Sequence, residues 1–216
     1  MNIILFGPPG AGKGTQAAKI VKDFNLHKVS TGELLREEIK NNTDLSNKIK
    51  SMIDQGSLIS DNIINDLIKK VLSNKKFYNC LIFDGYPRNL EQAKYLDTQI
   101  GKYKQKISCV LSLDVDKESA IKRILGRQTC TNCGLIFNKY YHPASDKNHS
   151  CDSKSLSKRS DDNKITIMNR FETYINKTLP IIDFYREQNL LYQVNGIAKI
   201  DRIFDEIRGI IASLET

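Results

Sequence analysis

The segment GPPGAGKGT at residues 7–15 constrains the fold of this chain more than any other part of the sequence. An apolar, β-branched stretch precedes it at residues 2–6, and apolar residues at helical spacing follow it at residues 17–24. Its glycines allow backbone N–H groups to point inward, the start of a helix adds a positive dipole end, and Lys13 supplies a full charge. The pattern predicts a strand, a phosphate-binding loop and a helix in succession, with a plain glycine turn as the alternative.

Strand and helix patterns alternate along the rest of the chain. Segments typical of buried strands end near residue 30 and span residues 80–84, 107–115 and 190–194. Helical periodicity covers residues 31–39, 44–54, 61–72, 90–98, 117–125 and 200–214, and residues 165–187 form one long helix or a pair kinked around Pro180. Because repeated strand–helix units build parallel sheets, the sequence predicts a single α/β domain over residues 1–216, with a five-stranded parallel sheet and helices on both faces.

The composition is that of a folded protein. Hydrophobic residues make up 40% and charged residues 27% of the 216, which excludes wholesale disorder. No apolar run approaches the roughly 18 residues that a membrane span needs, and no signal peptide is recognisable. Five cysteines in such a chain favour reduced thiols or a metal site over disulfides. We therefore expect a cytoplasmic protein with no membrane association.

The net charge of +8 raises the question of an anionic partner. The basic residues are spread along the chain, and the densest spots, at residues 69–70 and 75–76, form no long run and no interleaving with aromatic residues. This distribution favours a solvated surface, or a polyanionic small molecule such as a nucleotide, over a nucleic-acid footprint.

The phosphate loop departs from the generic pattern because Gly14 stands where Ser or Thr normally follows the lysine. In this form it resembles the loop of nucleoside monophosphate kinases, and that of the adenylate kinases most closely. Further segments match the motifs of that family in order: Ser30-Thr31-Gly32 with Leu35-Arg36, Asp84-Gly85-Tyr86-Pro87-Arg88 with Gln92, Arg123 with Gly126-Arg127, Arg159-Ser160-Asp161-Asp162, and Arg170.

The resemblance implies a P-loop NTPase fold of the long-lid type, with an AMP-binding helical insert at residues 30–60 and a small lid insert at residues 126–163. It also implies reversible, magnesium-dependent transfer of the terminal phosphoryl group from ATP to AMP, which gives two ADP. The partners would be ATP, AMP and ADP, with no nucleic acid and no membrane, and the protein would be a monomer.

The same resemblance assigns the site residues. The ATP side would comprise Gly10, Ala11, Gly12, Lys13, Gly14, Thr15, Arg123, Arg127, Ile136, Phe137 and Ala198. The AMP side would comprise Thr31, Gly32, Arg36, Ser57, Leu58, Ile59, Gly85, Tyr86, Pro87, Arg88, Gln92, Arg159 and Arg170, with Gln92 at the purine edge. Catalysis would rest on Lys13, Arg88, Arg127, Arg159 and Arg170. Arginine suits such roles because its planar fork binds phosphate oxygens bidentately and stays charged.

Three acidic residues complete this assignment. Asp84 would hold magnesium through water, and Asp161 and Asp162 would act in lid closure. Several of these assignments have a plainer alternative. Asp84 could form a strand-end turn, and one of Asp161 and Asp162 could be a helix N-cap. Arg36 and Arg88 could form surface ion pairs, and Gln92 could be a surface glutamine.

The polar segment from residue 126 to 163 carries three cysteines. Cys130 and Cys133 are spaced as half of a zinc site, and Cys151 follows, but Lys154 stands where the long-lid members of the family that this chain resembles often have a fourth ligand. Structural zinc takes four ligands, so the fourth donor would be Asp152, His149 or His142. A structural zinc bound by Cys130, Cys133 and Cys151 and a lid that has lost its metal both remain open.

Two other functions compete with the phosphotransfer between ATP and AMP. The first is a related kinase with a different base preference, such as a GTP donor or a UMP or CMP acceptor. The second is a zinc-ribbon nucleic-acid binder that carries a phosphate loop, for which Lys139, Tyr140 and Tyr141 are the only hint. Phosphotransfer would favour the kinase, and salt-sensitive oligonucleotide binding would favour the second function.

Overall fold

The computed structural model describes residues 1–40, 44–55, 59–145 and 147–214. Its main element is a five-stranded sheet in the order β2 (His27–Ser30), β3 (Leu81–Asp84), β1 (Asn2–Phe6), β4 (Cys109–Asp114) and β8 (Leu191–Asn195). Every neighbouring pair is parallel. The predicted α/β fold with a five-stranded parallel sheet is confirmed.

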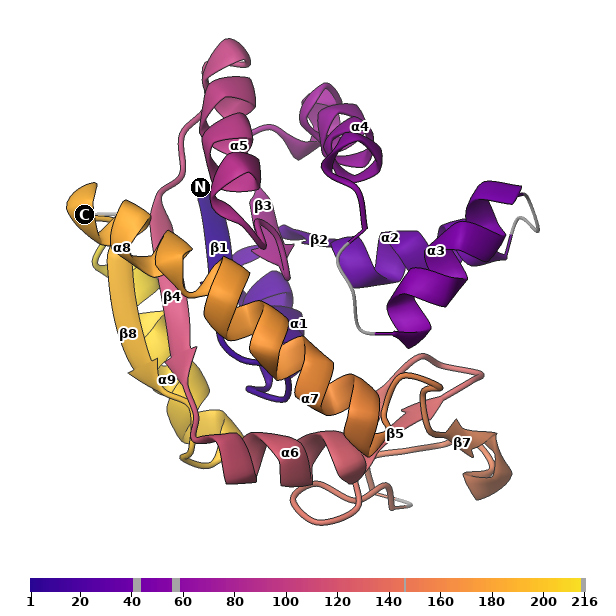
Figure 1. Ribbon diagram of the computed structural model, residues 1–216. Coiled ribbons are helices and arrows are strands. Elements are labelled where there is room, and N and C mark those ends of the chain that lie inside the picture. The colour runs from indigo at the N-terminus through magenta and orange to yellow at the C-terminus, as the bar shows by residue number, and fades with distance from the viewer. Residues whose placement is uncertain (41–43, 56–58, 146, 215–216) are drawn as a thin grey trace.

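Helices cover both faces of this sheet (Figure 1). Alternate residues of β1 point to opposite sides. Ile3 and Leu5 join an apolar cluster with α1 (Lys13–Phe24), α6 (Lys117–Leu125), α7 (Lys164–Thr173) and α9 (Ile200–Ala212). Ile4 and Phe6 join a second cluster with α4 (Asp61–Leu72), α5 (Leu90–Lys102) and α8 (Pro180–Glu187). The two clusters fix the carboxyl edge of the strands, where parallel sheets bind ligands.

Two helical regions show how the local sequence sets the elements. Helices α2 (Thr31–Ile39) and α3 (Asp44–Asp54) project beside the sheet, within the predicted 30–60 segment (Figure 1). The predicted kinked pair is present as α7, a π-helical turn (Tyr174–Thr178) and α8, which begins at Pro180. The wider turn closes through the Leu179 N–H, which donates to the Tyr174 carbonyl at 2.8 Å, five residues back.

The polar segment folds as a separate three-stranded antiparallel sheet in the order β6 (Ile136–Asn138), β5 (Arg127–Cys130) and β7 (Leu156–Ser157). Short 3-10 turns lie at Lys75–Phe77 and Ser153–Ser155. Element ends differ from prediction by a few residues, most at α5, which continues to Lys102 because Leu96, Gln99 and Ile100 stay buried on one face. No helix in the described part of the chain is long and apolar enough to span a bilayer.

Candidate nucleotide-binding cleft

A cleft of about 630 Å³ opens at the carboxyl edge of the sheet, between the phosphate loop, β3, α6, α7 and the small antiparallel sheet. The loop takes its shape from glycines with positive φ, 83° at Gly10 and 93° at Gly12. A Cβ on Gly10 would lie 2.3 Å from the Ala120 carbonyl oxygen of α6. Glycine is therefore required both for the backbone conformation and for the close packing of the loop on α6.

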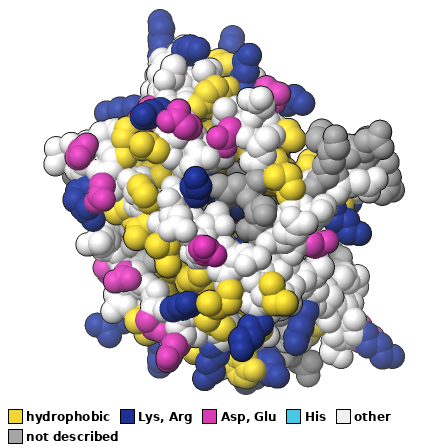
Figure 2. Space-filling model, viewed as in Figure 1, with side chains coloured by type: hydrophobic (Ala, Val, Ile, Leu, Met, Phe, Trp, Pro, Cys, Tyr) yellow, Lys and Arg dark blue, Asp and Glu magenta, His cyan; other side chains and the backbone are white. Residues whose placement is uncertain are grey.

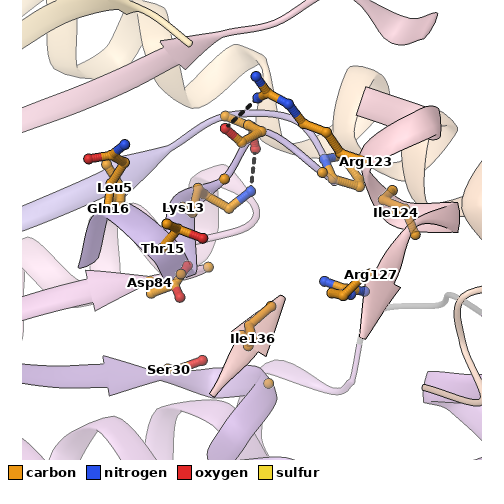
Figure 3. Close-up of a pocket in the computed structure, with 18 of the residues that line it drawn as sticks. Leu5, Lys13, Thr15, Gln16, Ser30, Asp84, Arg123, Ile124, Arg127 and Ile136 are labelled. Carbon is orange, nitrogen blue, oxygen red and sulfur yellow. Dashed lines mark hydrogen bonds between the residues drawn. The ribbon is translucent and has the colours of Figure 1, made fainter. Parts of the chain in front are cut away.

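Lys13 is the first residue of α1, and its ammonium group points back over the loop (Figure 3). It donates to the carbonyl oxygens of Gly7 at 2.7 Å and Pro8 at 3.0 Å. Burial lowers the pKa of Lys13 to about 8, against the opposing attraction of Asp84. A buried cation whose partners are mainly neutral carbonyls is favourably placed to receive an anion.

Five arginines predicted for catalysis or phosphate binding line the same cleft: Arg36, Arg88, Arg127, Arg159 and Arg170. Burial lowers the pKa of Arg88 to about 10 and that of Arg159 to about 10, and in both the neighbouring arginines add to the effect. Such an arrangement is electrostatically costly in the free protein, and phosphate groups would relieve it.

Two of these arginines are held by the predicted lid acids. Arg127 forms a bidentate pair with Asp162, whose side chain is only 1% exposed. Arg170 donates to Asp161 at 2.9 Å. The two aspartates therefore order the arginines, whereas the helix cap of α7 is provided by Asn163, which accepts from the Thr166 N–H at 3.0 Å.

Arg88 is fixed by three hydrogen bonds. Its Nε donates to the Gly85 carbonyl at 2.7 Å, and its backbone N–H donates to Gln92 Oε1 at 2.7 Å. The Thr178 hydroxyl, on the π-helical turn, donates to its backbone carbonyl at 2.8 Å. The sequence analysis did not include Thr178. Its contact with Arg88 depends on the widened helical turn, which the sequence does not indicate.

The other predicted acceptor residues divide into two groups. Gly32, Gly85 and Pro87 line the cleft. Thr31, Ile59 and Tyr86 are buried behind it, and the Thr31 hydroxyl donates to the Gly85 carbonyl at 2.9 Å. The predictions for Ser57 and Leu58 lie outside the described residues.

Gln92 is buried and does not belong to the cleft wall. Besides its bond to Arg88, its amide nitrogen donates to Asp61 Oδ1 at 2.6 Å. The structure thus excludes the surface-glutamine alternative and shows Gln92 positioning the Arg88 loop. Contact with a purine edge stays a prediction, which requires the bond to Asp61 to open.

The residues predicted to bind the phosphoryl donor also line the cleft. Arg123 comes from α6, Ile136 and Phe137 from β6, and Ala198 from the loop after β8 (Figures 1 and 3). Asn138, Tyr141 and His142 line the cleft as well. The sequence analysis considered His142 only as a metal ligand and Tyr141 only as a hint of nucleic-acid binding, and it did not name Asn138. The short distance in sequence from Ile136 and Phe137 is the signal that would have found them.

Four side chains that could bind a metal ion gather beside the small antiparallel sheet. The Sγ atoms of Cys130, Cys133 and Cys151 and a ring nitrogen of His149 all lie within 4.8 Å of one another. His149 Nε2 is buried and has no hydrogen-bond partner among the described residues. The Cys133 N–H donates to Cys130 Sγ at 3.5 Å, and this is the largest of several hydrogen bonds that lower the pKa of the Cys130 thiol to about 6.

This donor set is one that zinc prefers. Of the three candidates for the fourth donor, His149 is the one that the structure brings to the thiols. Asp152 instead accepts from the Lys154 N–H at 2.8 Å, and His142 forms a bridge to Asn138. The residues present therefore fit a structural metal ion.

Basic side chains on the visible face are scattered and interleaved with acidic ones (Figure 2). The basic groups gathered by the structure are those of the cleft. Both observations agree with a small polyanionic ligand.

A parallel sheet with a glycine-rich phosphate loop at its carboxyl edge and a second wall of arginines facing the loop defines a P-loop nucleotide-binding protein. The profile of the family described as adenylate kinase matches residues 5–190. A protein named adenylate kinase from Pelagibacter ubique is 43% identical over 98% of this chain and 99% of its own length. Proteins of the same name from Archaeoglobus fulgidus and Methanothrix thermoacetophila are 37% and 39% identical, each over the full length of both chains. The chain belongs to the adenylate kinase family.

Proposed function

We propose that this protein catalyses the reversible transfer of the terminal phosphoryl group from ATP to AMP, which gives two ADP. The observation that carries this proposal is the single cleft in which the phosphate loop faces Arg36, Arg88 and Arg170. Two phosphate-bearing ligands fit this arrangement, one at the loop and one at the arginines. Membership of the adenylate kinase family supports ATP as donor and AMP as acceptor over the other base preferences.

The proposed chemistry needs positioning and charge neutralisation more than covalent participation. Lys13 would exchange its carbonyl partners for donor phosphate oxygens. Arg88, fixed by Gly85 and Gln92, would hold the acceptor phosphate. Arg127, Arg159 and Arg170 would neutralise the charge on the group in transit, and Asp161 and Asp162 would keep two of them in place.

Magnesium would accompany ATP and supply further neutralisation of phosphate charge. Asp84 at the end of β3 and Thr15 on α1 both line the cleft and would hold it.

The test is ADP formation from ATP and magnesium, with AMP, UMP, CMP and GMP offered as separate acceptors. Strong activity with AMP alone is expected. Activity with another acceptor would keep the phosphoryl transfer and refute the acceptor base, and no activity with any acceptor would refute the proposal. Lys13→Met should abolish turnover, and Lys22→Met, an exposed lysine on the same helix, should leave it unchanged.

We also propose that residues 30–60 and 126–163 act as two inserts that close over the nucleotides and exclude water. The support is that α2 carries Arg36 and β5 of the small antiparallel sheet carries Arg127, so both inserts bring a cleft arginine from outside the main sheet. Fluorophore pairs that join each insert to α5 should shorten their distance when a two-substrate analogue binds. Unchanged distances would refute the closure.

We further propose that Cys130, Cys133, His149 and Cys151 bind one structural zinc ion. The thiols in reach and the unpartnered His149 Nε2 support it. Protein purified without chelator should contain about one zinc per chain by this four-ligand argument, and Cys133→Ser should lose it while Cys80→Ser retains it. If chelation removed the metal from the wild-type protein without changing its thermal stability, the proposal would be refuted.

Finally, we propose a monomer that works in the cytoplasm without nucleic acid or membrane. The support is the set of described cysteines, all of which are free thiols, and the scattered charge on the face shown in Figure 2. Light scattering that gives a dimer mass, or oligonucleotide binding at physiological salt, would contradict it.

A further inference from the structure

The segment from Asn138 to His142 folds back onto the C-terminal end of α6. Asn138 and His142 exchange both backbone hydrogen bonds, each at 2.9 Å. The Asn138 side chain donates to the Arg123 carbonyl at 2.7 Å, and its Oδ1 accepts from the N–H groups of Tyr140 and Tyr141 at 3.0 and 3.3 Å. The loop is therefore closed on itself and anchored to the residue that bears the donor-side guanidinium.

This anchorage places Tyr141 against Arg123. The guanidinium carbon lies 5.7 Å from the centre of the Tyr141 ring, within the range of a cation–π interaction. Arg123 Nη1 also donates to the Ala11 carbonyl of the phosphate loop at 3.2 Å (Figure 3). Arg123 is thus held between an aromatic ring and the loop, and both it and Tyr141 line the cleft.

Tyr140, the adjacent residue, has a different environment. Its ring lies over Gly126, where a Cβ would approach Tyr140 Cδ2 to 2.5 Å, and near the ammonium group of Lys139. The Lys122 ammonium group lies between the two tyrosines, 5.6 Å from the centre of the Tyr140 ring and 5.8 Å from that of Tyr141. Tyr140 does not belong to the cleft wall. The two tyrosines are half exposed alike, so they form a matched pair in which only one contacts the donor side.

We propose that Tyr141 is a positioning residue for the ATP-side arginine: it holds the planar guanidinium of Arg123 so that one face is available to the donor's base. This inference rests on the proposed function. An unsupported arginine side chain loses conformational entropy about several rotatable bonds when it stacks on a base. An arginine that is already held by a ring and a carbonyl loses less of this entropy. The base stacks on a guanidinium as an aromatic side chain does.

The test compares Tyr141→Leu, Tyr141→Phe and the control Tyr140→Leu by steady-state kinetics with ATP and AMP varied separately. Tyr141→Leu should raise the KM for ATP by about three- to tenfold, the range of one cation–π contact. The KM for AMP should stay within error. Tyr141→Phe keeps the ring and should behave like the wild-type protein, and so should Tyr140→Leu.

A double-mutant cycle distinguishes positioning from a general loss of structure. In an Arg123→Met background, Tyr141→Leu should have no further effect on the KM for ATP, because the group that it positions is gone. An unchanged KM in the single variant, or an equal rise in both backgrounds, would overturn the inference. Failure of the wild-type protein to phosphorylate AMP would instead refute the proposed function, so the two failures are distinguishable.

Discussion

Nucleotide binding should be coupled to proton uptake by Lys13. In the free protein, burial lowers the pKa of this ammonium group to about 8 from its usual 10.5. Donor phosphates placed against it would favour the charged form and return its pKa toward the usual value. Protein without nucleotide releases this proton as the pH rises through 8. Nucleotide binding above that pH is therefore accompanied by the uptake of a proton.

The size of the effect follows from these two pKa values. With a free pKa of about 8 and a bound pKa near 10.5, uptake should be about 0.1 proton at pH 7, about 0.5 at pH 8 and about 0.9 at pH 9. By linkage, ATP should bind about tenfold more weakly at pH 9 than at pH 7. The phosphates of magnesium-bound ATP are fully ionised across this range, so they add nothing to the change.

Titration calorimetry in buffers with different ionisation enthalpies measures the uptake. The apparent binding enthalpy should depend on the buffer strongly at pH 9 and weakly at pH 7. Lys13→Met should remove the dependence at every pH. A buffer-independent enthalpy for the wild-type protein at pH 9, or the same dependence in Lys13→Met, would refute the reasoning.

Three further substitutions, two of them with a matched control, test the cleft and the packing at Gly126. Arg88→Ala should lower kcat/KM for AMP by about 10- to 100-fold, the value of a charged hydrogen bond or two, with the KM for ATP within about threefold; an equal effect on both KM values in steady-state kinetics would contradict the acceptor role. Asp162→Asn should cost about 3 kcal/mol in urea unfolding, because it removes the buried carboxylate that pairs with the partly buried Arg127, whereas Asp183→Asn, at an exposed pair, should cost under about 0.5 kcal/mol. Gly126→Ala should cost about 1–3 kcal/mol, because its Cβ would lie 2.5 Å from an aromatic carbon, whereas Gly101→Ala, with open space around it, should be neutral or stabilising by up to about 1 kcal/mol. Equal losses for the two members of either pair would contradict these assignments.

The sequence was sufficient to predict the sheet and the convergence of the phosphate-binding groups. Strand periodicity and glycine spacing are local signals, and parallel topology places the ends of β1 and β3 at one edge. Lys13 and Asp84 follow from that geometry, because Lys13 ends the phosphate loop after β1 and Asp84 is the last residue of β3. Residues on the lid and α7, such as Arg159 and Arg170, were predicted only through resemblance to a family.

The remaining side chains could not be predicted because their places depend on packing between distant segments. Thr178 reaches the Arg88 carbonyl, 90 residues away, only through the widened turn after α7. Gln92 is drawn inward by Asp61 and the Arg88 backbone, which sequence spacing does not indicate. The fourth donor of the cysteine cluster depends on a loop conformation, and spacing alone left three candidates.

The cysteine cluster and the donor end of the cleft share one side chain, Phe137. Its ring packs against that of His149 with centroids 4.8 Å apart, and the residue also lines the cleft. A metal ion that fixes His149 would therefore fix Phe137 on β6, and ATP bound against Phe137 would favour the same arrangement. Because coupling between two binding events is reciprocal, chelation should weaken ATP binding, and ATP should slow metal loss by the same free energy. His149→Ala should abolish both effects while AMP binding is retained; ATP binding that is unaffected by chelation in the wild-type protein would show that the two sites are independent.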